Sequence, residues 1–239
     1  MTGAPGGDAV VVVRQVSKAY RLGKVAVPAL EDVSLRVTAG EFVAIAGPSG
    51  SGKTTLLNLI GCLDGPTRGE IEIDGESVGR LTSVQRADLR ARKMGFIFQS
   101  FNLIPVLTAE ENVEYPLLLR PRTADRRARV QRALEQVGLA ERARHRPPEL
   151  SGGQQQRVAI ARALVGDPAL VLADEPTANL DSRTGHDIVE LMRRLNQEHG
   201  TTFIFSTHDP RIMQAADRVL AISDGRLQST AEVGRCPTA

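Results

Sequence analysis

Short apolar runs alternate with helical hydrophobic spacing along most of this chain of 239 residues. The apolar or β-branched runs predict strands at Val10–Val16, Ser34–Val37, Phe42–Ala46, Glu70–Ile73, Gly95–Phe98, Leu170–Ala173, Thr202–Ser206 and Arg218–Ser223. Helical spacing predicts helices at Lys53–Leu63, Thr82–Arg92, Ser182–His199 and Arg211–Ala216. Such alternation predicts an α/β fold with a mainly parallel sheet covered by helices on both faces.

The middle of the chain departs from this alternation. From Thr108 to about Val165 the pattern is helical, and we expect it to be broken at Pro116, Pro121 and Pro147-Pro148. This stretch predicts an α-helical subdomain inserted at about residues 100–165. A tight turn at Asp74-Gly75 predicts a hairpin after the Glu70–Ile73 strand. Residues 1–8 and 229–239 are small and polar, and we expect them to be tails.

Composition excludes several classes of protein. With 41% hydrophobic and 24% charged residues the chain is globular, and its longest apolar runs are far shorter than the roughly 20 residues of a membrane span. A net charge of +2 and 3% aromatic residues argue against nucleic-acid binding. We expect Cys62 and Cys236 to be free thiols. Met1–Asp8 shows no signal peptide, so a cytoplasmic setting is expected.

A glycine-rich loop follows the Phe42–Ala46 strand and precedes a helix. It consists of Gly47, Pro48, Ser49, Gly50, Ser51, Gly52, Lys53 and Thr54, which fits the phosphate-binding pattern G-x-x-x-x-G-K-[ST]. The glycines let backbone N–H groups approach a polyphosphate, and the helix start adds its positive dipole end. Lys53 supplies a charge for the β- and γ-phosphates, and Thr54 supplies a hydroxyl for Mg²⁺.

Two carboxylates end the apolar strand Leu170–Ala173. At the carboxyl end of a strand in a parallel sheet, side chains face the ligand crevice. Asp174 would therefore reach Mg²⁺, and Glu175 would polarise an attacking water. Alone, such a pair is typical of solvated strand ends, but the phosphate loop upstream favours the catalytic interpretation.

A second phosphate-facing surface is predicted about 100 residues after the first. Ser151 stands at the N-cap position of a helix, followed by Gly152, Gly153 and Gln154. The Ser151 hydroxyl, the free N–H groups and the helix dipole together attract an anion. Because one chain needs only one site for the γ-phosphate, a second surface suggests that two chains share nucleotides across an interface.

These three elements resemble those of the ATP-binding cassette (ABC) ATPases, over about residues 10–227. Tyr20 matches the family's adenine-stacking aromatic, and Gln99 matches the glutamine that joins the Mg²⁺ and water site to the helical subdomain. Asn179-Leu180-Asp181 matches the loop that crosses the dimer interface, and His208 matches the histidine that contacts the γ-phosphate. The resemblance implies a P-loop NTPase cassette at residues 9–228, with an N-terminal antiparallel β subdomain beside the core sheet.

The resemblance also implies a mechanism. Two copies pair head to tail, and each ATP lies between Gly47–Thr55 of one subunit and Ser151–Gln154 of the other. Glu175 polarises water, while Lys53, Mg²⁺ and His208 stabilise the γ-phosphoryl charge. The implied metal site consists of Thr54, Gln99 and Asp174; Tyr20, Thr55 and Asp181 complete the nucleotide contacts.

A narrower resemblance is carried by 98–105, 107–117 and 174–181, which look like the macrolide-export and lipoprotein-release ATPases. That subgroup works with separate FtsX-like integral-membrane permeases, which places such a subunit on the inner face of the cell membrane through its permease. Ala178 departs from the subgroup, which commonly has glycine there.

Other interpretations share the same ATPase residues. One alternative is an ATP-gated regulator whose permease-like partner controls cell-wall enzymes without transport. A solute importer is another; the type that carries an extra C-terminal regulatory domain is disfavoured, because only about a dozen residues follow Leu227, and other types stay open. A DNA-repair or chromosome-organising ATPase head would need long heptad repeats, which this sequence lacks. The arginine-rich stretch 120–146 is interpreted either as a solvated helical surface or as a contact for an anionic membrane.

Overall fold

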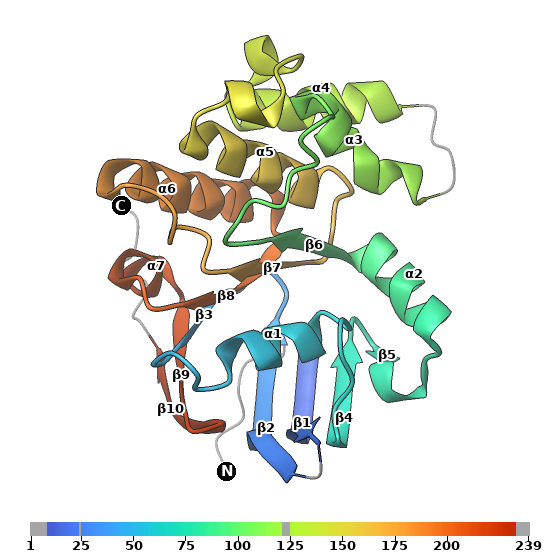
Figure 1. Cartoon of the computed structure of the whole chain (residues 1–239), viewed down its shortest axis with the longest axis vertical. Helices are drawn as coiled ribbons and strands as arrows, with labels where there is room; N and C mark the ends of the chain where they lie inside the picture. The colour runs from blue at the N-terminus through green and yellow to red at the C-terminus, as the bar shows by residue number, and fades with distance from the viewer. Residues whose placement is uncertain (1–8, 24, 121–124, 233–239) are drawn as a thin grey trace.

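The computed structural model describes residues 9–23, 25–120 and 125–232. Its core is a six-stranded sheet in the order β10-β9-β3-β8-β7-β6 (Figure 1). The strands are β3 (Phe42–Ala46), β6 (Met94–Ile97), β7 (Leu170–Asp174), β8 (Thr202–Thr207), β9 (Arg218–Ser223) and β10 (Arg226–Glu232). Every neighbouring pair is parallel except β9 with β10. The predicted α/β class with a mainly parallel sheet is confirmed.

Both faces of the core sheet are buried, which is why its strands are continuous apolar runs in the sequence. On one face Phe42, Phe203 and Phe205 pack together, with ring centroids of Phe42 and Phe205 4.4 Å apart. On the other face Val43, Ile45 and Ile204 belong to a second apolar cluster. Helices therefore have to cover both sides of the sheet.

Helix α1 (Lys53–Ile60) lies between the core sheet and a second sheet (Figure 1). Its side chains Leu56, Leu59 and Ile60 are fully buried in the cluster that both sheets share. The helix stops at Ile60 and not at the predicted Leu63, because Gly61 caps it and Cys62 turns the chain with φ of 55°.

The second sheet is antiparallel, as the resemblance implied, in the order β2-β1-β4-β5. Its strands are β1 (Ala9–Leu22), β2 (Val25–Thr38), β4 (Arg68–Ile73) and β5 (Glu76–Ser77). The Asp74-Gly75 turn joins β4 to β5, which confirms the predicted hairpin. Strands β1 and β2 are longer than predicted because register shifts interrupt their alternation, near Gln15 and Asp32, whose φ values are positive.

The remaining helices are α2 (Ser83–Lys93), α3 (Ala109–Leu118), α4 (Arg126–Gln136), α5 (Gly152–Leu164), α6 (Ser182–His199) and α7 (Pro210–Ala215). Helices α3, α4 and α5 form the predicted helical insert between β6 and β7 (Figure 1). Thr82 and Thr108 begin α2 and α3 through capping boxes with Gln85 and Glu111. Among the described helices, none combines the length and the apolar character that a bilayer crossing needs.

Two expectations about the ends of elements are wrong. Pro116 lies inside α3 and does not break it, because in the last turn it removes only one hydrogen bond before the helix ends. Residues 229–232, expected in the tail, extend β10 and pair with β9 although Ala231 is their only apolar residue. The expected tails at 1–8 and 233–239 lie outside the described residues, as do Pro121 and Arg122.

Several arginines of the stretch 120–146 make contacts within the protein. Arg126 lies 3.9 Å from Glu114, and Arg129 pairs with Asp125 and with Asp167. The guanidinium of Arg120 donates to the backbone carbonyl oxygens of Gly166 and Ala91.

Candidate functional site

The loop from Gly47 to Thr54 connects β3 to α1, which is the predicted strand–loop–helix arrangement. A Cβ atom at Gly47 would lie 2.1 Å from the carbonyl oxygen of Ile222, so only glycine fits there. Gly52 has φ of 104°, a conformation that also requires glycine. Inside the loop, Nζ of Lys53 donates to the carbonyl oxygens of Gly47 (2.8 Å) and Pro48 (2.9 Å). The lysine is thus held within the loop by its carbonyl groups.

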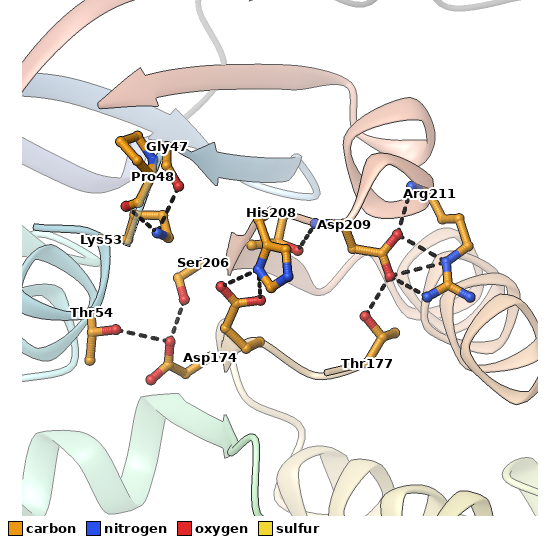
Figure 2. Close-up of polar contacts among 12 residues, drawn as sticks. Gly47, Pro48, Lys53, Thr54, Asp174, Thr177, Ser206, His208, Asp209 and Arg211 are labelled. Atoms are coloured by element: carbon orange, nitrogen blue, oxygen red, sulfur yellow. Dashed lines mark hydrogen bonds and ion pairs between the residues drawn. The ribbon is translucent and has the colours of Figure 1, made fainter. Parts of the chain in front are cut away.

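Asp174 ends β7 beside the first turn of α1. Its Oδ1 accepts hydrogen bonds from the hydroxyl groups of Thr54 (3.2 Å) and Ser206, as Figure 2 shows. Sequence analysis missed Ser206, although its place one strand over in β8, in register with Asp174, is the signal that a sheet model could have used. The strand ends therefore bring three oxygen-bearing side chains to the start of the phosphate loop helix.

Glu175 follows Asp174 in a left-handed conformation with φ of 46°, which is uncommon for a residue other than glycine. Its N–H donates to the carbonyl oxygen of Ser206 (2.9 Å). Nδ1 of His208 lies 2.9 Å from Oε1 of Glu175. The carboxylate is mostly enclosed, with 17% of its side chain exposed, whereas that of His208 is 72% exposed. The two predicted catalytic side chains are in contact.

Several of these residues line a cleft of about 620 Å³ at the carboxyl edge of the core sheet, whereas Asp174 and Ser206 are not part of its described lining. The predicted residues that line it are Gly47, Pro48, Ser49, Gly50, Gly52, Lys53, Thr54, Thr55, Gln99, Glu175 and His208. Ala29 and Ala178 also line it and were not predicted. A single chain thus brings together residues from distant parts of the sequence in one cleft that has room for a polyphosphate.

Other predicted site residues are absent from the lining of this cleft as the described residues define it. Ser51 is buried within the loop itself. Ser151 instead caps α5: its hydroxyl accepts from the N–H of Gln154 (3.3 Å), whose side-chain oxygen accepts from the N–H of Ser151 (2.9 Å). Gly152 and Gly153 form the first turn of that helix, and the turn is accessible to solvent.

Asp181 likewise caps a helix, α6, by accepting from the N–H groups of Arg183 (3.1 Å) and Thr184 (3.0 Å). Hydrogen bonds from Thr184 and then from Arg183 lower the pKa of its carboxyl group. Asn179, two residues earlier, donates through its side-chain amide to the carbonyl oxygen of Gln99 (2.9 Å). The loop before α6 is therefore joined to the loop after β6.

Tyr20 stands apart from the cleft lining but is firmly held. Its hydroxyl donates to Asp64 (3.0 Å), and Nζ of Lys18 lies 4.8 Å from the ring centroid and 2.7 Å from the Asp64 carboxylate. Burial first, and then the bond to Asp64, raises the pKa of the tyrosine. Tyr20 as a whole remains 43% exposed, so its ring can still receive a flat ligand.

A further polar network, which sequence analysis missed, borders the His208 segment. Asp209 accepts from the hydroxyl of Thr177 (2.6 Å) and from the guanidinium of Arg211 at 2.6 to 3.0 Å (Figure 2). Burial alone would raise the pKa of Asp209, but the hydrogen bonds from Arg211 and Thr177 outweigh it and lower the pKa to about 2.

This lowered pKa predicts an acid-dependent loss of stability. The carboxylate stabilises the folded state above the pKa of about 3.8 that an unperturbed Asp has, and this contribution is lost as pH falls toward 2. We expect Asp209→Asn to lower the free energy of unfolding by about 2 kcal/mol at pH 7. The deficit relative to the wild type should shrink by about half at pH 3. Urea unfolding at several pH values measures it, and a deficit that is constant with pH would contradict the assignment.

Comparison with known proteins supports the geometry. A family model described as ABC transporter matches residues 30–178. The lipoprotein-releasing system ATP-binding protein LolD of Bordetella pertussis is 49% identical over 214 residues, which are 89% of this chain and 93% of LolD. The macrolide export ATP-binding/permease protein MacB of Syntrophobacter fumaroxidans is 48% identical over 231 residues, 95% of this chain. The chain spans only 32% of that MacB.

A solved structure agrees in fold. The ATP-binding cassette MJ0796 of Methanocaldococcus jannaschii, described as a dimeric post-hydrolysis state bound to ADP and Pi, has a TM-score of 0.86 and 46% identity. The match covers 94% of this chain and 99% of that one. The chain therefore belongs to the ABC transporter family, as an ATP-binding cassette ATPase.

Proposed function

We propose that the chain hydrolyses ATP as a head-to-tail homodimer, with each nucleotide between the Gly47–Thr55 loop of one subunit and the Ser151–Gln154 turn of the other. The observation that carries this proposal is the division of the site. Lys53 and Glu175 share one cleft, whereas the Ser151–Gln154 turn is accessible and contributes nothing to that cleft's described lining. A helix N-terminus of this kind binds a phosphate well when a second chain brings one to it.

Within each site the proposed chemistry is positioning combined with charge stabilisation. Glu175 polarises the attacking water, and its contact with His208 fixes the direction of the carboxylate. Lys53 exchanges its carbonyl partners for the β- and γ-phosphates, and His208 contacts the γ-phosphate. Tyr20 stacks on the adenine from outside the cleft, in line with its exposed ring.

The oxygen-bearing side chains beside the phosphate loop fit Mg²⁺. The hydroxyl of Thr54 and the carboxylate of Asp174 are 3.2 Å apart, and Gln99 lines the same cleft as Thr54. Hydroxyl, carboxylate and amide oxygens are the ligands that Mg²⁺ takes beside phosphates. When bound, the ion would offset the charge of the β- and γ-phosphates. Ser206 orients Asp174 for this role through its own hydroxyl.

The partner that we propose is a separate FtsX-like permease, because relatives with similar cassettes carry the names lipoprotein-releasing and macrolide export ATP-binding/permease. An apolar groove of about 390 Å³ between α2, α3 and α5 offers a docking place. It is lined by, among others, Met94, Phe96, Phe98, Tyr115 and Leu119. Docking there would hold the subunit, as one cassette from residue 9 through β10, at the cytoplasmic face of the membrane.

Position in the fold makes this groove a suitable place for coupling. Phe98 and Asn102 line the groove, and Gln99 between them lines the nucleotide cleft. A permease segment bound in the groove would therefore contact the same loop that contacts the nucleotide. Export, lipoprotein release and force transmission are all compatible with this arrangement.

Co-purification tests the partner. Leu119→Asp places a charge in the groove, and we expect it to reduce recovery of the membrane partner by about tenfold. ATP hydrolysis by the isolated chain should stay within about twofold of the wild type, since Leu119 is outside the cleft lining. Val84→Asp is the matched control, because Val84 is also an exposed aliphatic residue and lies outside the groove lining. Equal recovery of the partner with wild type and Leu119→Asp would contradict docking here.

A further inference from the structure

His208 is held through its two neighbours in sequence, and its exposed side chain contacts Glu175 and lines the nucleotide cleft. Thr207, before it, is fully buried, and Asp209, after it, is 8% exposed. The N–H of Asp209 donates to the Thr207 hydroxyl (2.9 Å), which closes a tight turn around the histidine. The position of the imidazole is thus set by what holds Thr207 and Asp209.

Asp209 joins this turn to the segment that carries Glu175. Its Oδ2 accepts from the hydroxyl of Thr177 at 2.6 Å, and Thr177 is 3% exposed. Thr177 lies two residues after Glu175, within a segment that is itself fixed: the amide of Gln156 donates to the carbonyl oxygen of Pro176 (2.7 Å). The buried Thr177–Asp209 bond therefore sets the distance between the Glu175 segment and the His208 segment.

Arg211 extends the same network to the start of α6. Its guanidinium donates to both oxygens of Asp209 and also to the carbonyl oxygen of Ser182 (2.5 Å). Gly185 leaves the room for it, since a Cβ there would lie 2.6 Å from Nη1 of Arg211. Ser182 directly follows Asp181, which belongs to the loop expected at the dimer interface.

Helix capping alone does not explain this arrangement. Asp209 is the N-cap of α7 and accepts from the N–H of Arg211 through Oδ1. That role would leave Oδ2 available, yet Oδ2 is committed to Thr177 and to the Arg211 side chain. The carboxylate thus joins the segments of His208 and Glu175 directly, and it reaches the Ser182 segment through Arg211.

We propose that Asp209, together with Thr177 and Arg211, is a positioning residue for ATP hydrolysis. The network holds the imidazole of His208 and the carboxylate of Glu175 in one geometry and ties that geometry to the loop before α6. This inference rests on the proposed catalytic roles of Glu175 and His208.

Removing the hydroxyl of Thr177 tests the positioning role of this network. Thr177→Val keeps the shape of the side chain and removes only the donor to Asp209, and we expect kcat to fall about tenfold, since displacements below 1 Å are costly in active sites. KM for ATP should stay within about twofold, because the phosphate loop is untouched. Thr177→Ser restores the hydroxyl and should recover most of the rate. Asp187→Asn, which removes an exposed carboxylate on α6, is the control and should leave kcat unchanged.

A double-mutant cycle separates positioning from a general structural role. In a His208→Ala background, measured by single-turnover hydrolysis, Thr177→Val should cost clearly less than the tenfold expected in the wild type, because one of the two side chains that it positions is gone. Full additivity with His208→Ala would overturn the proposal, as would an unchanged kcat in Thr177→Val or an equal loss in Thr177→Ser. If Glu175→Gln and His208→Ala themselves hydrolyse ATP normally, the proposed catalytic roles of these two residues are wrong. That result differs from one in which both variants are impaired but Thr177→Val is not, which contradicts only the positioning role.

Discussion

Glu175→Gln is expected to hydrolyse ATP about a thousandfold more slowly than the wild type while still binding it, since loss of a general base typically costs 10²–10⁴ in rate. Glutamine has the size of glutamate and can keep a polar contact with His208, so the cleft should keep its shape. What it loses is the basic oxygen that polarises water. Steady-state phosphate release and equilibrium binding of labelled ATP measure the two effects separately.

The same variant should accumulate as a dimer in the presence of ATP, because nucleotide that is bound between two subunits is no longer consumed. Light scattering after size-exclusion chromatography, with and without ATP, measures the mass. Glu190→Gln, an exposed residue of α6, is the matched control and should hydrolyse ATP like the wild type. If Glu175→Gln stays monomeric with saturating ATP, the shared-site arrangement is wrong.

Two separately inactive variants should restore activity when mixed. Lys53→Ala removes the charge for the phosphates from one half of the site. Gly152→Asp places a carboxylate against them from the other half, and it should fold, because a Cβ there meets neighbours only at 3.6 Å and beyond and an acidic residue favours a helix N-terminus. Each pure variant should lose more than about 99% of its hydrolysis, given what single charge-stabilising groups contribute.

The mixed dimer has one site with both defects and one site with none. With random pairing, half of the dimers are mixed, so about a quarter of the wild-type activity should return if the sites act independently in a two-fold symmetric dimer. Gly152→Ala adds the same Cβ without charge and should keep most of the activity. No gain on mixing, with exchange of subunits verified by mass, would place Lys53 and Gly152 in the same half-site and refute the head-to-tail model.

The sequence motifs that are contiguous could be predicted, because the functional residues of each are neighbours in sequence at the end of a strand. The phosphate loop and the Asp174-Glu175 pair lie where they were expected, since an apolar run fixes the strand and the strand fixes its end. Ser206 and the Thr177–Asp209 bond were not predictable in the same way. They link residues 32 positions apart, and only the alignment of β7 with β8 brings their segments together.

The errors in the predicted bounds of helices and strands also have local causes. The bulges at Gln15 and Asp32 interrupt the alternation that strand prediction relies on, so β1 and β2 were expected to be shorter. The last residues of β10 are held by backbone pairing with β9 and carry no apolar pattern. Pro116 in the final turn of α3 shows that a proline signals a helix end only approximately.

Two residues that are neighbours in sequence line two different surfaces of this fold. Phe98 lines the apolar groove and Gln99 lines the nucleotide cleft, so the surfaces can vary independently although they share a loop. Under the proposed docking, substitutions at the groove would change which permease is recognised and leave ATP hydrolysis intact. This modularity would let closely similar cassettes serve unlike membrane systems.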